Sequence, residues 1–185
     1  ESLSRKYASK KKMQKMPVRI NEQDYSFSPG KHNQLQKYVI EEFAPRFAPD
    51  SVCLYVGDTT QKDLVKDIKM LSRLGFEITP HDKMPDIVLY VEDKNWIYFI
   101  ECVTSVGPME PKRILEIEAM TQNVVADKIF ITAFQDFATY KKFSDKLAWE
   151  TEVWIGDMPD HMIHLNGDRF LGPRNHAPQS TTSDR

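Results

Sequence analysis

Apolar positions along the chain recur at helical spacing in several stretches, and each of these predicts a helix. Residues 26–49 carry an apolar face and should end irregularly at Pro45; that face comprises Leu35, Val39, Ile40, Phe43 and Phe47. Residues 60–76 predict a second helix that Gly75 ends, with Leu64, Ile68, Leu71 and Leu74 facing inward. Further helices are expected over residues 109–124, where Pro111 suits the first turn, and over 136–149.

Short apolar runs predict strands between these helices. They cover residues 51–60, 87–91, 96–103, 128–134, 151–155 and 161–167. A polar four-residue loop separates 87–91 from 96–103, so we expect these two strands to form an antiparallel hairpin. The alternation of helices and strands predicts an α/β fold with a mixed central sheet flanked by helices.

Two carboxylates are expected to meet at one end of this hairpin. If Val91 pairs with Trp96, the register places Asp86 opposite Glu101, and opposed side chains share one face with Cβ atoms ~5 Å apart. Two unit charges ~4 Å apart repel by about 4 kcal/mol at an effective dielectric constant of ~20. A divalent cation would remove this cost, and two carboxylates with several waters suit Mg²⁺. The alternative is structural: Asp86 caps its strand and Glu101 meets a lysine.

Two further acidic residues are candidates for the same metal site. Asp58 ends the strand 51–60 and would approach the pair if that strand runs antiparallel beside 87–91. Its alternative role is an Asx-turn or helix N-cap in "GDTT". Glu42 lies at the edge of the apolar face of the first helix, from where it could reach the site. Its alternative role is that of an ordinary solvated charge.

A site for phosphate chemistry also needs a cation, and two lysines are candidates. Lys112 opens the helix 109–124, where free backbone N–H groups and the helix dipole also favour a phosphate. Lys83 lies close to Asp86 in the sequence, but the strand register could turn it away. We therefore place Lys112 ahead of Lys83, and a solvated surface position is the alternative for each.

Composition limits the class of protein. The chain has 185 residues, 41% hydrophobic and 28% charged, as is typical of one globular domain. A formal net charge of −2 excludes a generally basic nucleic-acid coat and leaves room for a local basic cleft. The sequence has no apolar run of transmembrane length and no signal-peptide pattern. Its two cysteines, Cys53 and Cys102, fall in apolar strands, so we expect a cytoplasmic protein without membrane partners.

The two ends of the chain differ in composition from the middle. Residues 1–27 start with a polar and basic stretch, which is typical of a linker or of the tail of a preceding domain. Residues 28–174 are expected to form the main domain, and residues 175–185 a disordered tail. Because the first residue is Glu, we expect the chain to be a piece of a longer protein.

The sequence around the paired carboxylates resembles the PD-(D/E)XK nuclease superfamily. The resemblance rests on Pro85-Asp86 at a strand start, the apolar hairpin, and Glu101 in "IECVTS". More narrowly, "LYVGDT", "HDKMPDIVLY", "KNWIYFIECVTSVGPMEPKR" and "LAWETEVWI" are similar to the nuclease domain of BsuBI/PstI-type restriction endonucleases. This resemblance implies a PD-(D/E)XK restriction-endonuclease-like core and a bacterial type II enzyme that cuts double-stranded DNA at a palindromic site with Mg²⁺. It also implies a homodimer and an N-terminal DNA-binding domain that this chain lacks.

One position departs from the superfamily pattern. The motif ends in Glu-x-Lys, whereas Val103 stands at the lysine position here. The nuclease hypothesis therefore assigns the metal to Asp86 and Glu101, with Asp58 or Glu42 acting through water, and takes the cation from Lys112 or Lys83. The missing lysine also favours a rival, a catalytically inactive DNA-binding module with a nuclease fold. A third hypothesis is an enzyme for small phosphate esters.

Overall fold

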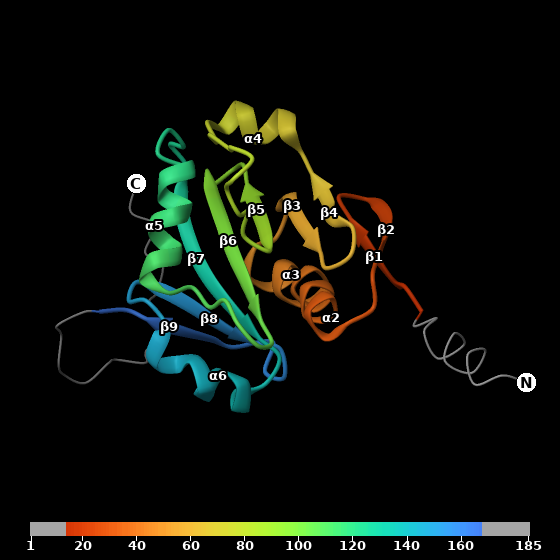
Figure 1. Ribbon diagram of the computed structural model, residues 1–185, viewed down its shortest axis with the longest axis vertical. Helices are drawn as coiled ribbons and strands as arrows, with labels where there is room; N and C mark the ends of the chain where they lie inside the picture. The colour runs from red at the N-terminus through yellow and green to blue at the C-terminus, as the bar shows by residue number, and fades with distance from the viewer. Residues whose placement is uncertain (1–13, 168–185) are drawn as a thin grey trace, which may run out of the picture.

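A seven-stranded mixed sheet forms the centre of the protein, whose structure is a computed structural model that describes residues 14–167 (Figure 1). The strands are β3 (Val52–Asp58), β4 (Lys62–Lys66), β5 (Ile87–Val91), β6 (Trp96–Val103), β7 (Asp127–Phe134), β8 (Thr151–Ile155) and β9 (Met162–Leu165). Their order across the sheet is β4-β3-β5-β6-β7-β8-β9. Only β6–β7 and β7–β8 pair in parallel within this sheet, and the remaining neighbours are antiparallel.

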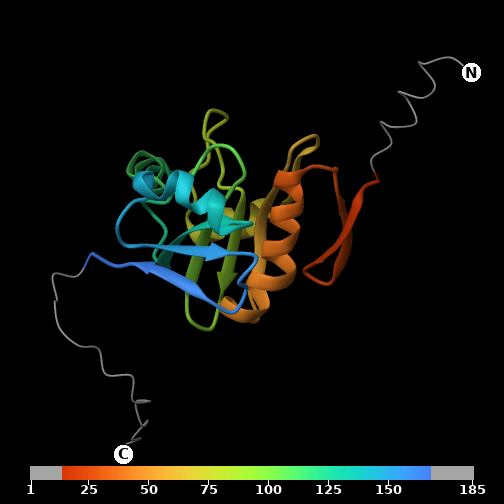
Figure 2. The same cartoon turned by 90° about the horizontal axis from the view of Figure 1, so that it is seen from below.

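Helices cover both faces of this sheet (Figure 2). One face carries a continuous helical segment made of α2 (Lys31–Tyr38), a π-helical turn (Val39–Phe43) and α3 (Ala44–Phe47). The other face carries α4 (Ile68–Leu74), α5 (Pro111–Met120) and, over β7 and β8, α6 (Phe137–Phe143) with a 3₁₀ turn (Ser144–Lys146). Successive residues of β5 divide between the faces, since Ile87 and Leu89 pack with α2 whereas Val88 and Tyr90 pack with α4 and α5.

The helical segment 31–47 has the irregular end that Pro45 predicts. Five residues before α3 adopt the wider π-helical turn. Proline lacks the N–H group that would continue the hydrogen-bond ladder, so the chain widens one turn earlier. The predicted apolar face is also found, because Leu35, Val39 and Phe43 are buried in the core.

The prediction of a single helix over residues 60–76 is wrong. Residues 62–66 form β4, which pairs with β3, and the helix begins only after Asp67, whose side chain accepts the N–H of Met70 at 3.0 Å. Ile68 is 67% exposed, so it does not face the core as the helical pattern predicted. The spacing of leucines misled because a short edge strand and a short helix follow each other with no glycine or proline between them.

An additional hairpin shows that the folded domain begins before residue 28. β1 (Met16–Ile20) and β2 (Gln23–Phe27) pair antiparallel, and Val18, Ile20 and Phe27 are buried in the same core cluster as α2. The Asn21 side chain also exchanges two hydrogen bonds of 2.8 Å with the backbone of Cys53 in β3. The expected linker therefore does not extend over residues 16–27. Residues 1–13, the expected domain end at 174 and the tail 175–185 lie outside the described residues.

The two cysteines behave as core residues. Cys53 and Cys102 are buried free thiols. Burial raises the pKa of Cys53 to about 12 and that of Cys102 well above its ordinary value, so neither is a reactive thiolate at neutral pH. Between residues 14 and 167, no helix is long and apolar enough to cross a membrane.

Gly75 should be the glycine most sensitive to substitution by alanine. It ends α4 with φ +100°, and an added Cβ would lie 2.5 Å from the carbonyl oxygen of Asn123. We expect Gly75→Ala to lower the free energy of unfolding by about 1 to 3 kcal/mol or more, because backbone strain and a backbone clash act together. Gly107, with φ +90° and open space around it, is the matched control. In urea unfolding, an equal loss for Gly75→Ala and Gly107→Ala would contradict the clash.

Candidate active site

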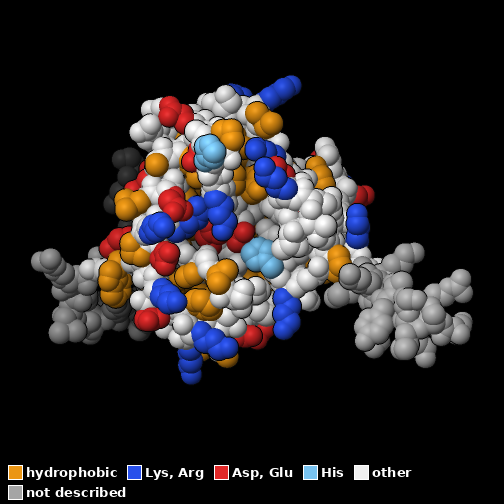
Figure 3. Space-filling view, viewed as in Figure 1, with side chains coloured by type: hydrophobic (Ala, Val, Ile, Leu, Met, Phe, Trp, Pro, Cys, Tyr) orange, Lys and Arg blue, Asp and Glu red, His pale blue; other side chains and the backbone are white. Residues whose placement is uncertain are grey.

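A cavity of about 430 Å³ lies at the end of the sheet where β3 and β5 meet the loop that precedes β5. Its walls include His32 and Gln36 from α2, Asp58 from β3, and Lys83 and Asp86 from the loop. Figure 3 shows a hollow near the middle of this view, with acidic side chains inside it and Lys, Arg and His side chains around it. The cavity therefore brings both kinds of charge that phosphate chemistry needs to one place.

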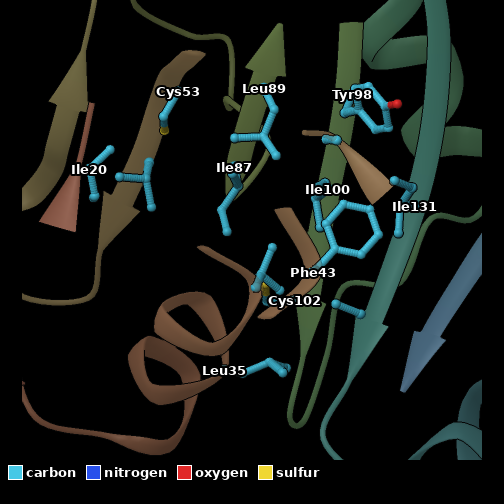
Figure 4. Close-up of a cluster of buried hydrophobic side chains, with 14 of the residues drawn as sticks. Ile20, Leu35, Phe43, Cys53, Ile87, Leu89, Tyr98, Ile100, Cys102 and Ile131 are labelled. Carbon is cyan, nitrogen blue, oxygen red and sulfur yellow. The ribbon is translucent and has the colours of Figure 1, made fainter. Parts of the chain in front are cut away.

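Asp86 and Glu101 meet beside this cavity as the hairpin register predicts. Val91 pairs with Trp96 and Ile87 with Ile100, so the next step of the same register is Asp86 with Glu101. The neighbours of Glu101 on β6, Ile100 and Cys102, belong to the core (Figure 4), and Cys102 donates its backbone N–H to Asp86 Oδ2 at 2.8 Å. This hydrogen bond fixes the Asp86 carboxylate next to the backbone of β6.

The proximity of Asp86 and Glu101 is electrostatically unfavourable, as the strand register predicts. The Glu101 side chain is buried, and this burial raises the pKa of its carboxyl group. The negative charge of Asp86 raises the pKa further, whereas Arg113 opposes the change. The pKa of Glu101 therefore lies well above its ordinary value in the absence of a bound cation.

Arg113 is a member of the site that the sequence analysis missed. Its Nε donates to Glu101 Oε1 at 2.5 Å, and its two other nitrogens donate to the Lys83 carbonyl oxygen at 3.0 Å and to Glu116 at 3.1 Å. Glu101 thus meets an arginine where the structural alternative expected a lysine. A signal was present, because Arg113, Ile117 and Met120 follow helical spacing and form the buried face of α5.

His32 is a second missed residue. Its Nε2 lies 3.3 Å from Asp86 Oδ1, and the hydrogen bond with Asp86 raises the pKa of the imidazole although burial lowers it. His32 belongs to α2, which packs on the face of the sheet opposite to α5, the helix that carries Arg113. A single histidine near a helix start carries no local signal for such a contact, because the contact depends on how α2 packs.

Asp58 lies in the cavity wall, but both of its carboxylate oxygens accept hydrogen bonds from within the protein. Oδ1 accepts hydrogen bonds from the backbone N–H of Ser28 at 2.7 Å and from Asn33 at 3.1 Å, and Oδ2 accepts the N–H groups of Thr60 and Gln61 at 2.9 Å each. Burial alone would raise the pKa of Asp58, but these hydrogen bonds lower it. The structure favours the turn-capping role, in which Asp58 joins the end of β3 to the start of α2.

Glu42 is not among the residues of the cavity wall. Its carboxylate pairs with Arg46 at 2.6 Å, and Arg46 also binds Asp160 at 2.7 Å. Glu42 therefore takes part in a surface ion-pair network between the helical segment and the loop before β9, and this geometry gives no support to a metal role.

The two candidate lysines also differ in position. Lys83 lines the cavity next to His32, and its positive charge lowers the pKa of that histidine. Lys112 stands at the start of α5 and is absent from the cavity wall. The structure thus favours Lys83 over Lys112, the reverse of the order we expected from the sequence.

The donor set suits a hydrated divalent cation. No group of three or more His, Cys, Asp and Glu side chains is arranged to hold a metal ion in the region 14–167. Mg²⁺, however, commonly uses one or two carboxylates and completes its shell with waters and substrate phosphate oxygens. Gln36 also lines the cavity, and its buried Oε1 has no hydrogen-bond partner among the described residues. Its amide nitrogen donates to Asn33 Oδ1 and to the carbonyl oxygen of Gly57. The residues present therefore fit such an ion.

For the nuclease that the sequence resembles, Lys83→Ala should slow DNA cleavage more than Lys112→Ala. Removing one electrostatic stabiliser of a phosphate costs about 100-fold or more in rate, and only Lys83 lies at the cavity. The measurement is the single-turnover rate of each variant at saturating enzyme. A larger loss for Lys112→Ala would support the order expected from the sequence, in which Lys112 comes before Lys83.

A comparison with solved structures identifies the class of protein. The structure of the SdaI restriction endonuclease superimposes with a TM-score of 0.80 at 36% sequence identity, covering 94% of this chain and 55% of that one. The α/β fold expected from the sequence is therefore confirmed, and it is the fold of a restriction endonuclease.

Sequence comparison gives the family. The model of the BsuBI/PstI restriction endonuclease domain matches residues 16–168, so the chain belongs to this family. Type II restriction enzyme BsuBI of Bacillus subtilis is 41% identical over 174 residues, which are 94% of this chain and 55% of that protein. Type II restriction enzyme AplI of Arthrospira platensis is 32% identical over 182 residues, with 92% and 55% covered. The chain thus spans about half the length of these relatives.

Proposed function

We propose that this chain is the catalytic domain of a type II restriction endonuclease and hydrolyses phosphodiester bonds of double-stranded DNA with Mg²⁺. The observation that carries the proposal is the Asp86–Glu101 pair, which stands at a cavity edge in a member of the BsuBI/PstI restriction endonuclease family. Burial and the charge of Asp86 raise the pKa of Glu101 even though Arg113 opposes the change, and a bound metal ion would offset this cost.

In this proposal, different side chains bind the metal ion and the attacked phosphate. Asp86 and Glu101 would hold Mg²⁺, which supplies Lewis-acid stabilisation of phosphate charge and lowers the pKa of water. The Lys83 ammonium group would neutralise charge on the attacked phosphate. Arg113 orients Glu101 through its 2.5 Å contact, and His32 does the same for Asp86. Arg113 and His32 are positioning residues in this proposal.

Three further features belong to the whole protein. Its relatives are nearly twice as long as this chain, which leaves room for the N-terminal DNA-binding domain that the resemblance implies. An enzyme that cuts both strands of a palindromic site is expected to act as a two-fold homodimer. The relatives named here come from bacteria, and we propose that the protein acts in the bacterial cytoplasm.

Incubation of the chain with duplex DNA tests this function. We expect strand cleavage with Mg²⁺ and none with Ca²⁺ or EDTA. Binding without cleavage in Mg²⁺ would favour the inactive DNA-binding module, whose support is Val103 at the usual lysine position. Hydrolysis of a small phosphodiester at a rate comparable with DNA would favour an enzyme for small phosphate esters.

The chain alone should bind DNA weakly and with strong salt dependence. A net charge of −2 gives little general attraction to DNA, and most duplex affinity comes from phosphate contacts. Titrations of specific and scrambled duplexes at two salt concentrations measure this. Nanomolar, salt-tolerant and sequence-selective binding would place recognition within these 185 residues.

A further inference from the structure

The active-site cavity continues away from Asp86 along the β3–β4 hairpin, and this outer part has no role in the site described above. Tyr55 and Gly57 of β3 and Lys62, Asp63 and Lys66 of the β4 strand line it. The register places Lys66 opposite Tyr55 and Lys62 opposite Asp58, so both lysines follow the strand that leads to the site.

The positive and negative residues of this cavity differ in their exposure to solvent. The three lysines in its wall, Lys62, Lys66 and Lys83, are all exposed, whereas the four aspartates of the wall are buried or half-buried. The lysines of this cavity are therefore more exposed to solvent than its aspartates. A phosphodiester chain that enters this cavity meets ammonium groups before it meets carboxylates.

The aspartates beyond the catalytic pair are already engaged inside the protein. Asp58 accepts four hydrogen bonds, Asp63 accepts the Tyr55 hydroxyl at 2.7 Å, and Asp82 accepts the N–H of Thr79 at 2.7 Å. The ammonium groups of Lys62 and Lys66, in contrast, form no ion pair or hydrogen bond within the described part of the chain. Two free cations beside engaged carboxylates are suited to an external anion.

We propose that Lys62 and Lys66 hold the backbone phosphates next to the scissile phosphate and thereby set the path of the cleaved strand along β4. This inference rests on the proposed nuclease function and adds the substrate-binding side of the site to it. Both lysines act in binding and lie outside the metal site, so they contribute to affinity and KM. Contacts to phosphate carry no sequence information, and the effect should be the same for any duplex.

The salt dependence of DNA binding tests this assignment. Each phosphate contact contributes about 0.9 to the slope of log K against log salt concentration. We expect Lys62→Ala and Lys66→Ala each to reduce the slope by about 0.9 and to raise the KM for cleavage, with little change in kcat. Lys62→Arg and Lys66→Arg should retain the slope, which a purely structural role would not predict. Binding is measured with Ca²⁺ and a duplex of arbitrary sequence.

Lys94 provides the matched control. It carries the same charge but lies in the turn between β5 and β6, over the Trp96 ring, at the opposite end of the hairpin from Asp86. Lys94→Ala should leave the slope unchanged. If Lys62→Ala and Lys66→Ala both behave like Lys94→Ala, or if the wild-type chain shows no binding at low salt, the proposal is overturned.

The same experiment distinguishes this inference from the function on which it rests. Cleavage with Mg²⁺ together with unchanged slopes would refute the phosphate path and leave the nuclease assignment intact. Reduced slopes without any cleavage would support the phosphate path in a protein that binds DNA but does not cut it.

Discussion

Replacing Asp86 by asparagine should abolish DNA cleavage and leave the fold intact. The substitution keeps the shape of the side chain, and its amide oxygen can still accept the Cys102 N–H at 2.8 Å. It removes one of the two charges expected to hold Mg²⁺, whose stabilisation of the transition state is worth several kcal/mol. We expect the single-turnover rate to fall by at least about 100-fold.

The corresponding substitution at the second carboxylate is Glu101→Gln. It should abolish cleavage as well, although its effect on stability differs from that of Asp86→Asn. Asp86→Asn relieves like-charge repulsion, so its melting temperature in EDTA should stay level or rise. Glu101→Gln takes the charge partner from buried Arg113 and should lower the melting temperature. Normal cleavage by either variant would exclude that carboxylate from the metal site.

Arg113→Ala should be among the most destabilising substitutions at this site. The Arg113 side chain is 9% exposed and the Glu101 side chain 4% exposed, so the pair is shielded from water. Removing one partner of a buried ion pair costs about 3 to 5 kcal/mol, because the other charge stays buried and unpaired. We expect a loss of this size in the free energy of unfolding above the raised pKa of Glu101, about 8, where this carboxyl is ionised; urea denaturation measures it.

Glu116→Ala is the control for this substitution. Glu116 also binds Arg113, at 3.1 Å, but its side chain is 47% exposed, and surface ion pairs contribute about 1 kcal/mol or less. A loss for Arg113→Ala no greater than that for Glu116→Ala would show that the buried pair does not stabilise the fold.

The strand hairpin and the carboxylate pair could be predicted because both follow from local rules. The apolar runs set the bounds of β5 and β6, and the loop length set the pairing of Val91 with Trp96. Once that register was assumed, the position of Asp86 opposite Glu101 followed from the alternation of side chains along a strand.

Other members of the site could not be predicted because they depend on tertiary packing. His32 approaches Asp86 only because α2 crosses the end of the sheet, and no periodicity encodes that crossing. The sequence placed Lys112 ahead of Lys83, whereas only Lys83 lines the cavity, because the direction in which a loop side chain points is not set by a strand register. Arg113 is different, since its helical spacing placed it on the buried face and the sequence analysis overlooked it.

The β1–β2 hairpin shows that the average composition of a segment does not predict its secondary structure. A basic, polar start predicted a linker up to residue 27, yet Val18, Ile20 and Phe27 alternate in the pattern of a half-buried hairpin. Arg19, which lies between Val18 and Ile20, is exposed. Average polarity over the segment concealed this alternation.

The most direct test of the metal site is a crystal structure of the protein with duplex DNA and Ca²⁺. We expect one cation to contact oxygens of both Asp86 and Glu101 and a phosphate oxygen of the DNA, with Lys83 beside the same phosphate. A cation bound elsewhere, or DNA placed away from the Asp86–Glu101 pair, would contradict the proposed active site.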